Sequence, residues 1–276
     1  MHDILVLSPV FNQESSKQYI LSIQLCLDGF SFLICDSISN KFIYLKHKPY
    51  GSDSEITDQT LKYLKTEELL NLNYKKVIVL YDLSPATCIP QVLFEDEEKE
   101  VFYTKNYRKG KSSIVRSDKQ DPLNYVSVYA INETILNAMN QQFGTPVIIH
   151  NNTIKNCHLL STSESFVKLT IRQNRFSISA YKNNTLILAN SYSYQNDDEF
   201  LYFFLYCFNQ LKLDQMKTVV EIDGIIPKHA SLVKQLERFI KNVTFAGWPE
   251  AYNFANDFYD LPAHYFTNLY SSLLCE

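Results

Sequence analysis

Two stretches of the chain carry the same pattern of apolar and polar positions. From Tyr19 to Leu45, three short apolar runs are separated by residues typical of turns. From Phe166 to Ala189 the arrangement recurs, and Phe30-Ser31 aligns with Phe176-Ser177 at an offset of 146 residues. Alternating apolar positions between turn residues are typical of antiparallel strands. Each stretch therefore predicts three consecutive antiparallel strands.

The first stretch is followed by a helix and a buried strand. Apolar positions from Ile56 to about Leu72 approximate one helical face, and Ser52 or Ser54 could cap its start. The run VIVLYD, from Val77 to Asp82, is short and continuously apolar, as expected of a buried parallel strand. Near the N-terminus, Ile4 to Val10 could add an edge strand or cover the core.

The second stretch has the same sequel. A helix is predicted from about Asp197 to Lys212, apolar on nearly all sides, and a strand from Thr218 to Ile222. The order strand, strand, strand, helix, strand thus occurs twice. We therefore predict an internally duplicated α/β protein with halves at 1–160 and 161–276 and a cleft between them.

A different segment interrupts the first half at about 86–150. It contains a predicted strand from Tyr125 to Ile131, a helix from Glu133 to Phe143 and a strand from Pro146 to His150. The tract from Lys105 to Gln120 is polar and basic, and we interpret it as a solvated loop. We predict a small inserted α+β module.

Composition narrows the class of protein. The chain has 276 residues, 46 % of them hydrophobic, and a net charge of −4, which does not favour nucleic acid as a partner. The 6 glycines are few for a protein that cradles phosphate with backbone amides. No run approaches the roughly 20 apolar residues of a membrane-spanning helix. We expect no membrane span.

Cysteines and C-terminal aromatic residues are both interpreted as core. Most of the 6 cysteines lie in apolar runs, which predicts reduced thiols in a cytoplasmic protein. The C-terminal aromatic residues recur at loosely helical spacing, which favours core packing over a ligand cage. They are Trp248, Phe254, Phe258, Tyr259, Tyr265, Phe266 and Tyr270.

The sequence gives little support for a metal site or for nuclease activity. The 6 histidines form neither an HExxH motif nor an i, i+4 pair, so we expect no metal site. A ribonuclease-H-type nuclease needs several carboxylates converging on two metal ions. The four strand-end candidates, however, divide two and two between the halves, and we interpret Asp82 and Asp223 as strand-end residues that line the cleft. The four candidates are Asp28, Asp82, Glu221 and Asp223.

The duplicated pattern resembles the actin-like ATPase superfamily, in which two ribonuclease-H-like halves face each other across a cleft. A module inserted in the first half is similar to that of bacterial division and pilus-assembly members. The whole chain is similar to a bacterial family of this fold whose members carry no assigned activity. This likeness rests on LDGFSF at Leu27 to Phe32, YVSVYAI with its following helix, and LPAHYF…CE from Leu261 to Glu276.

In active members of that superfamily, the first hairpin turn of each half wraps the phosphates and places a metal-binding carboxylate. Here the first turn keeps Asp28, Gly29 and Ser31, but Phe30 and Phe32 replace the rest of the pattern. The second turn, Gln173-Asn174-Arg175-Phe176, has no carboxylate and no glycine. The adenosine motif would fall near Asp223 and Gly224, with one glycine where two are usual.

The resemblance therefore implies a non-catalytic pseudo-enzyme that binds protein partners through the retained scaffold and needs no cofactor. The alternative is an ATP-binding ATPase or kinase with magnesium in the cleft, using Asp28, Gly29, Ser31, Asp223 and Gly224. A void lined by backbone amides at the two turns would favour nucleotide. A cleft plugged by aromatic side chains would favour a scaffold.

The basic tract from Lys105 to Gln120 is the strongest local concentration of positive charge in this mildly acidic chain. It could dock an acidic partner, but we favour the interpretation as a solvated loop. The candidate contact residues are Lys105, Arg108, Lys109 and Lys111.

Overall fold

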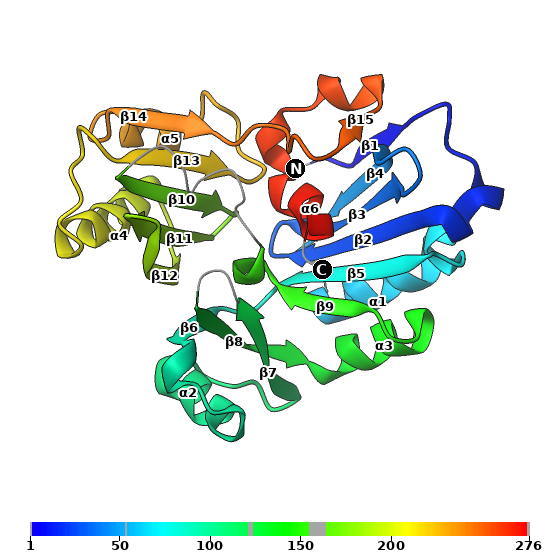
Figure 1. Cartoon of the computed structure of the whole chain (residues 1–276), viewed down its shortest axis with the longest axis horizontal. Helices are drawn as coiled ribbons and strands as arrows, with labels where there is room; N and C mark the ends of the chain where they lie inside the picture. Colours follow the sequence, from blue (N-terminus) through cyan, green and yellow to red (C-terminus); the bar gives the residue numbers. More distant parts are fainter. Residues whose placement is uncertain (1, 53, 121–123, 155–163, 275–276) are drawn as a thin grey trace.

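The computed structural model describes residues 2–52, 54–120, 124–154 and 164–274. Within them, the first half builds six strands of a seven-stranded sheet, in the order β1-β4-β3-β2-β5-β9, and the C-terminal segment adds β15 beside β4 (Figure 1). The strands of this sheet are β1 (Ile4–Leu7), β2 (Tyr19–Cys26), β3 (Gly29–Asp36), β4 (Lys41–Pro49), β5 (Lys76–Asp82), β9 (Val147–His150) and β15 (Asn253–Phe254).

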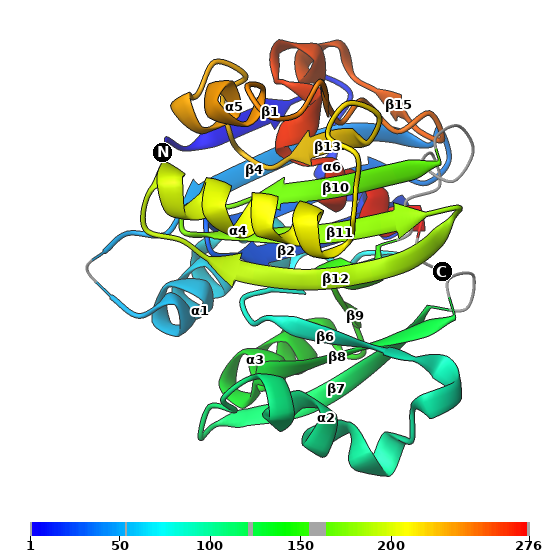
Figure 2. The ribbon, with the colours of Figure 1, turned by 90° about the vertical axis from the view of Figure 1, so that its left-hand side faces the viewer.

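The second half builds a separate sheet in the order β12-β11-β10-β13-β14. Helix α4 lies across its outer face, as Figure 2 shows. The elements of this half are β10 (Ser165–Ile171), β11 (Arg175–Lys182), β12 (Thr185–Ser193), α4 (Asp197–Gln210), β13 (Val219–Asp223), α5 (Ser231–Leu236) and β14 (Asn242–Phe245).

The two halves repeat one topology, which confirms the predicted duplication of the fold. In each half, three antiparallel strands are followed by a helix and a strand parallel to the first strand of the three. The repeat extends further than predicted, because a second helix and a further parallel strand follow: α3 (Glu133–Phe143) with β9, and α5 with β14. Each half therefore has the ribonuclease-H-like order.

Turn residues set the hairpins of both halves. Asn183 and Asn184 have φ angles of 49° and 61°, as a tight primed turn requires, and they join β11 to β12 where predicted. The predicted Asp28-Gly29 turn is shifted by one residue. Cys26 pairs with Gly29, so the loop residues are Leu27 and Asp28, and Gly29 is already the first residue of β3.

The sheet of the first half is covered on both faces. Helices α1 (Ile56–Thr66) and α3 pack on one face, where Leu64 and Met139 join the core beneath β2 and β3. Neither predicted serine caps α1, because the N-cap residue is Glu55. The helix ends at Thr66, and the short 3₁₀ helix η2 (Glu68–Asn71) continues the chain.

The C-terminal aromatic segment covers the other face, as core packing predicted. Phe258, Phe266 and Tyr270 are each at most 1 % exposed, whereas Tyr259 is on the surface. Helix α6 (Thr267–Ser271) lies between the two large sheets (Figure 1). Among the described residues, the remaining short 3₁₀ helices are η1 (Gln13–Gln18), η3 (Gln91–Leu93), η4 (Asp96–Glu98), η6 (Asn151–Thr153), η7 (Asn256–Asp260), η8 (Ala263–Tyr265) and η9 (Ser272–Leu274).

The inserted segment carries a third sheet in the order β6-β8-β7. Three sequence interpretations are corrected here: β6 was missed, half of the supposed basic loop is strand β7, and α3 and β9, predicted as part of the module, belong to the first sheet and its core. Asp118 explains the second error, because this half-buried carboxylate within β7 accepts a hydrogen bond from the backbone N–H of His150 at 2.7 Å. The elements are β6 (Ala86–Pro90), α2 (Lys99–Asn106), β7 (Ser113–Gln120) and β8 (Tyr125–Asn132).

No helix within the described residues is long and apolar enough to cross a membrane. Cys26, Cys35, Cys88 and Cys207 are free thiols. The predictions for Cys157 and for Cys275 with Glu276 lie outside the described residues.

Candidate functional site

The first hairpin turns of the two halves meet in the cleft. Asp28 follows β2, and Arg172 and Gln173 follow β10, the equivalent strand of the second half. The backbone N–H of Gln173 donates a hydrogen bond to Asp28 Oδ1 at 2.8 Å. The two turns that the repeat aligns in the sequence are therefore in direct contact in the structure.

Arg172 extends from the second half between two carboxylates of the first. Its Nε and Nη2 atoms each lie 3.3 Å from Asp82 Oδ2, and its Nη1 lies 3.6 Å from Asp28 Oδ2. Arg175 adds an Nη2 contact to Asp82 Oδ1 at 2.8 Å and a hydrogen bond to the Asp82 carbonyl. We call Asp28, Asp82, Arg172 and Arg175 the ion cluster.

The topology explains this convergence. Strands β2 and β5 are parallel, with Cys26 opposite Asp82, so their carboxyl ends place both aspartates at one edge of the first sheet. The hairpin β10-β11 supplies both arginines from the opposite half. All four side chains are at most 8 % exposed. The ion cluster thus joins the halves with two negative and two positive groups.

Burial dominates the electrostatics of the ion cluster. Burial raises the pKa of Asp28, while the Arg172 guanidinium and the Gln173 N–H act in the opposite direction. Burial also opposes the charge of Arg172, yet the surrounding acidic groups, including Asp82 and Asp28, raise its pKa above the ordinary value. Arginine keeps its charge at all relevant pH values.

A second polar cluster lies beside the first and contains Asp223. Its Oδ2 accepts a hydrogen bond from Thr170 at 3.0 Å and lies 3.5 Å from Lys168 Nζ. Asn268, on α6, donates to Asp223 Oδ1 at 3.1 Å and accepts from Lys168 at 2.8 Å. Asp223 therefore ties the C-terminal helix to the second sheet.

The two predicted site glycines are required by close packing of the chain itself. A Cβ atom on Gly29 would lie 2.3 Å from the carbonyl oxygen of Lys48. At Gly224, where φ is +115°, it would lie 2.1 Å from the carbonyl oxygen of Ile171. Real Cβ contacts are never this short, so both positions exclude other residues without any ligand.

Ser31 is paired with a histidine. Its Oγ lies 2.8 Å from Nδ1 of His47, and both side chains are at most 1 % exposed. Burial, with a smaller contribution from Arg172, lowers the pKa of His47 to about 4. The imidazole is therefore neutral at physiological pH.

The structure brings Asp28 together with Asp82, whereas Ser31 and Asp223 lie in separate hydrogen-bonding groups.

A cavity of about 490 Å³ remains between the halves beside the ion cluster. Asp28, Arg172 and Gln173 line it, together with Tyr50 and Tyr194. The cleft matches neither of the two predicted alternatives, because arginines rather than aromatic side chains occupy the meeting point of the turns. Among the described residues, no group of three or more His, Cys, Asp or Glu side chains could hold a metal ion.

Arg172 and Arg175 were not recognised as site residues from the sequence. Their signal was the pair of arginines around the turn RQNR, directly after the apolar strand FVKLTI. A charged residue at each end of a buried turn requires a partner of opposite charge. Which carboxylates serve as partners could not be deduced from spacing.

The candidate residues of the basic tract lie at the end of α2 and in the loop before β7. Lys105, Arg108 and Lys111 are exposed, and Lys109 forms an ion pair with Glu100. Their role in docking stays a prediction.

Two ribonuclease-H-like halves that face each other across a cleft define the actin-like ATPase fold. Comparison with solved structures agrees. A Bacteroides thetaiotaomicron protein with an actin-like ATPase fold and unknown function is 25 % identical, with a TM-score of 0.84, and the match covers 97 % of this chain and 100 % of that one.

Two more distant structures share the fold. The PilM-PilN type IV pilus biogenesis complex matches at 12 % identity and a TM-score of 0.64, over 93 % of this chain and 98 % of that one. The cytoplasmic domain of EpsL, an inner membrane component of the type II secretion system of Vibrio cholerae, matches at 8 % identity and a TM-score of 0.50, over 94 % and 95 %.

The chain belongs to the family described as protein of unknown function (DUF3822), whose profile matches residues 8–243. A comparison with curated proteins finds no match.

Proposed function

We propose that this chain is a non-catalytic, cytoplasmic member of the actin-like fold that acts by binding a protein partner. The observation that carries the proposal is the position of Arg172. Its guanidinium lies between Asp28 and Asp82, at the meeting point of the two turns that hold phosphate in active members of the superfamily.

Binding of magnesium and ATP there would disrupt this arrangement. Magnesium prefers carboxylates and water as ligands in near-ideal octahedral geometry. Both oxygens of Asp82 already contact arginines, and Asp28 Oδ1 accepts the N–H of Gln173. A metal ion shared by both carboxylates would have to displace the buried Arg172 guanidinium from between them and leave its charge without a partner, which is strongly unfavourable. We therefore expect no physiological nucleotide binding.

A protein-binding role is supported by the names of two proteins with this fold. PilM is part of a complex with PilN, and EpsL is a component of a secretion system. The scaffold of this chain retains both halves and adds the inserted sheet of β6, β7 and β8. We transfer from these relatives the class of function, and neither their partners nor their assemblies.

ATP binding is retained as a second candidate because of the 490 Å³ cavity beside Asp28. Thermal unfolding with and without Mg·ATP separates the two, since a ligand that binds the native state raises its unfolding temperature. We expect no shift for the wild-type chain. A clear stabilisation that disappears in Asp28→Ala would overturn the proposal.

A further inference from the structure

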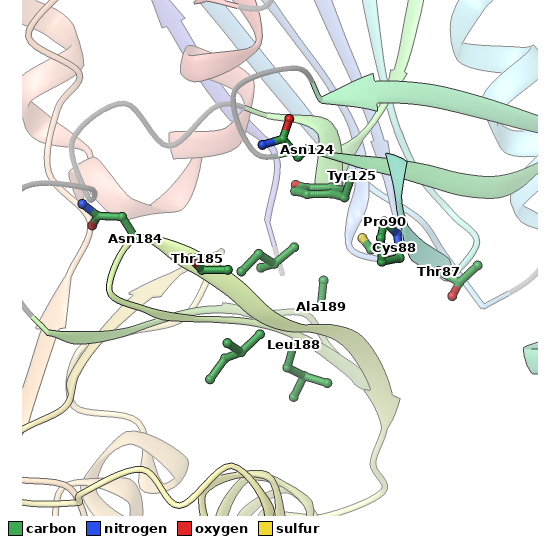
Figure 3. A pocket seen from close by; sticks show the side chains of 11 residues that line it. Thr87, Cys88, Pro90, Asn124, Tyr125, Asn184, Thr185, Leu188 and Ala189 are labelled. Carbon is green, nitrogen blue, oxygen red and sulfur yellow. The ribbon is translucent and has the colours of Figure 1, made fainter. Parts of the chain in front are cut away.

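Two surface features of the second half lie outside the ion cluster. A groove of about 530 Å³ lies between β12 and β6 (Figure 3), and its lining mixes polar side chains, such as Asn124 and Asn184, with apolar ones. Such a lining selects no single class of occupant. The outer face of α4, on the side of the helix away from its sheet (Figure 2), carries a more specific pattern of shape and charge.

Helix α4 buries one side and exposes aromatic rings on the other. Phe200, Phe204 and Phe208 pack into the core of the second half and are each at most 1 % exposed. Tyr202 and Tyr206, which are 64 % and 50 % exposed, lie on the opposite side and stack on each other with ring centroids 6.3 Å apart. Residues four apart are neighbours on one helix face. Two adjacent exposed tyrosine rings are typical of a surface that contacts another protein.

The charge of this face changes sign along the helix. The first turn carries three acidic residues, Asp197, Asp198 and Glu199. Glu199 caps the helix by accepting the N–H of Gln195 at 2.7 Å, whereas Asp198 is exposed. At the other end, the last turn is uncharged and the exposed Lys212 lies just beyond it. Within the described part of the chain, neither Asp198 nor Lys212 forms an ion pair. Two copies of the helix therefore match in charge when they are antiparallel and repel when they are parallel.

A hollow of about 560 Å³ adjoins the C-terminal part of α4. Leu205, Asn209 and Lys212 line it, together with residues of the turn that follows the helix. Tyr202, three residues before Leu205, projects from the same side of the helix. The face thus has a projection in its N-terminal half and a hollow in its C-terminal half. A two-fold axis across the helix places each projection opposite a hollow, as a self-complementary interface requires.

Helix geometry fixes the register of such a pair. If the two-fold axis passes level with Phe204, the midpoint of the tyrosine pair, Tyr202 of one copy lies across from residues 205–209 of the other, where the hollow is. Lys212 then lies about 3 Å along the axis from the level of Asp198 in the other copy, at about 1.5 Å per residue. A lysine side chain spans that distance.

We propose that α4 packs antiparallel against α4 of a second copy of this chain. Tyr202 fills the hollow of the other copy, and Asp198 and Lys212 form two equivalent ion pairs at the ends. A pair of 14-residue helices, each about 21 Å long, makes a small interface, so we expect a micromolar Kd. This inference does not rest on the proposed function, because the outer face of α4 lies apart from the ion cluster.

The test is sedimentation equilibrium of the full chain over about 1–300 µM, a range that brackets a micromolar Kd. Tyr202→Ser removes the projecting ring and should weaken dimerisation by at least about tenfold, as expected for loss of a buried aromatic anchor. Tyr259→Ser is the matched control, because Tyr259 is 59 % exposed but lies in the C-terminal segment. Both rings are exposed in the single chain, so the unfolding temperature of the diluted protein should stay close to that of wild type in both variants.

Charge reversal tests the antiparallel arrangement separately. Asp198→Lys and Lys212→Asp each place like charges at both ends of the interface, so each should dimerise about tenfold more weakly than wild type. The double variant Asp198→Lys/Lys212→Asp restores opposite charges and should recover wild-type dimerisation. Both substitutions oppose the dipole of α4, so recovery in the double variant has no explanation in a more stable helix.

Three results would overturn the inference: a wild-type chain that stays monomeric up to about 300 µM, a dimer that Tyr202→Ser leaves intact, or a double variant as weak as the single ones. The first would leave another protein as the occupant of this face. The second would place the contact between copies elsewhere, and the third would exclude the antiparallel order.

Discussion

Replacing Arg172 with methionine removes the charge that links the two halves and keeps a long unbranched side chain. The Arg172 side chain is 4 % exposed, and the carboxylates of Asp28 and Asp82 are 2 % and 3 % exposed. Asp82 keeps its contact with Arg175. Asp28 keeps the N–H of Gln173 but loses its neighbouring positive charge.

Breaking a buried ion pair by removing one partner costs about 3–5 kcal/mol. Because Asp82 retains Arg175, we expect the lower end, about 3 kcal/mol less unfolding free energy at neutral pH. For a chain of this size that corresponds to an unfolding temperature about 6 °C lower. Urea denaturation followed by circular dichroism measures the change, with an unchanged slope against denaturant if the unfolded state is unaffected.

The double variant Asp28→Asn/Arg172→Met provides the control. It removes the uncompensated carboxylate as well, so it should be more stable than the sum of the two single losses predicts. A loss below about 1 kcal/mol for Arg172→Met, or strict additivity in the double variant, would refute a linking role for the ion cluster.

Two further perturbations test the close packing at Gly224 and the burial of His47. In Gly224→Ala the new Cβ would meet the Ile171 carbonyl, so we expect a loss of about 3 kcal/mol in thermal unfolding. Gly144→Ala is the control, because nothing lies within 4 Å of its Cβ despite a positive φ, and an equal loss there would contradict the packing argument. The pKa of His47, lowered to about 4, means that the unfolded chain takes up a proton first as pH falls. The unfolding free energy should therefore decrease by about 3 kcal/mol between about pH 6.5 and pH 4. In His47→Asn, the slope of unfolding free energy against pH should be flatter over this range. Identical slopes of unfolding free energy against pH would show that His47 is not responsible.

The duplicated core could be predicted because its strands are short apolar runs between turn residues. The pair Asn183-Asn184 marks its hairpin by residue type alone, and the continuous run at Val77 to Asp82 reports a strand buried on both faces. The inserted sheet was harder to predict. Pro90 ends β6 at an edge where no N–H is needed, and Asp118 makes β7 appear polar although its carboxylate accepts hydrogen bonds from His150 and Thr153 within the fold.

The candidate site was predictable only in part. The sequence shows that the second turn lacks a carboxylate and a glycine, and the structure agrees that Asp28 lies in the cleft opposite that turn. Asp82, the partner shared by Arg172 and Arg175, is 90 and 93 positions away from them along the chain, and Asp28 is farther still, in the same half as Asp82. Such pairs depend on how the two sheets face each other, and no local spacing encodes that arrangement.

Calorimetric titration of the wild-type chain with Mg·ATP tests most directly whether its own arginines close the cleft to nucleotide. We predict no saturable heat of binding up to about 1 mM nucleotide, a limit of about −4 kcal/mol in binding free energy. Saturable binding with a micromolar Kd that is abolished by Asp28→Ala would contradict the proposal and make the cleft a nucleotide site.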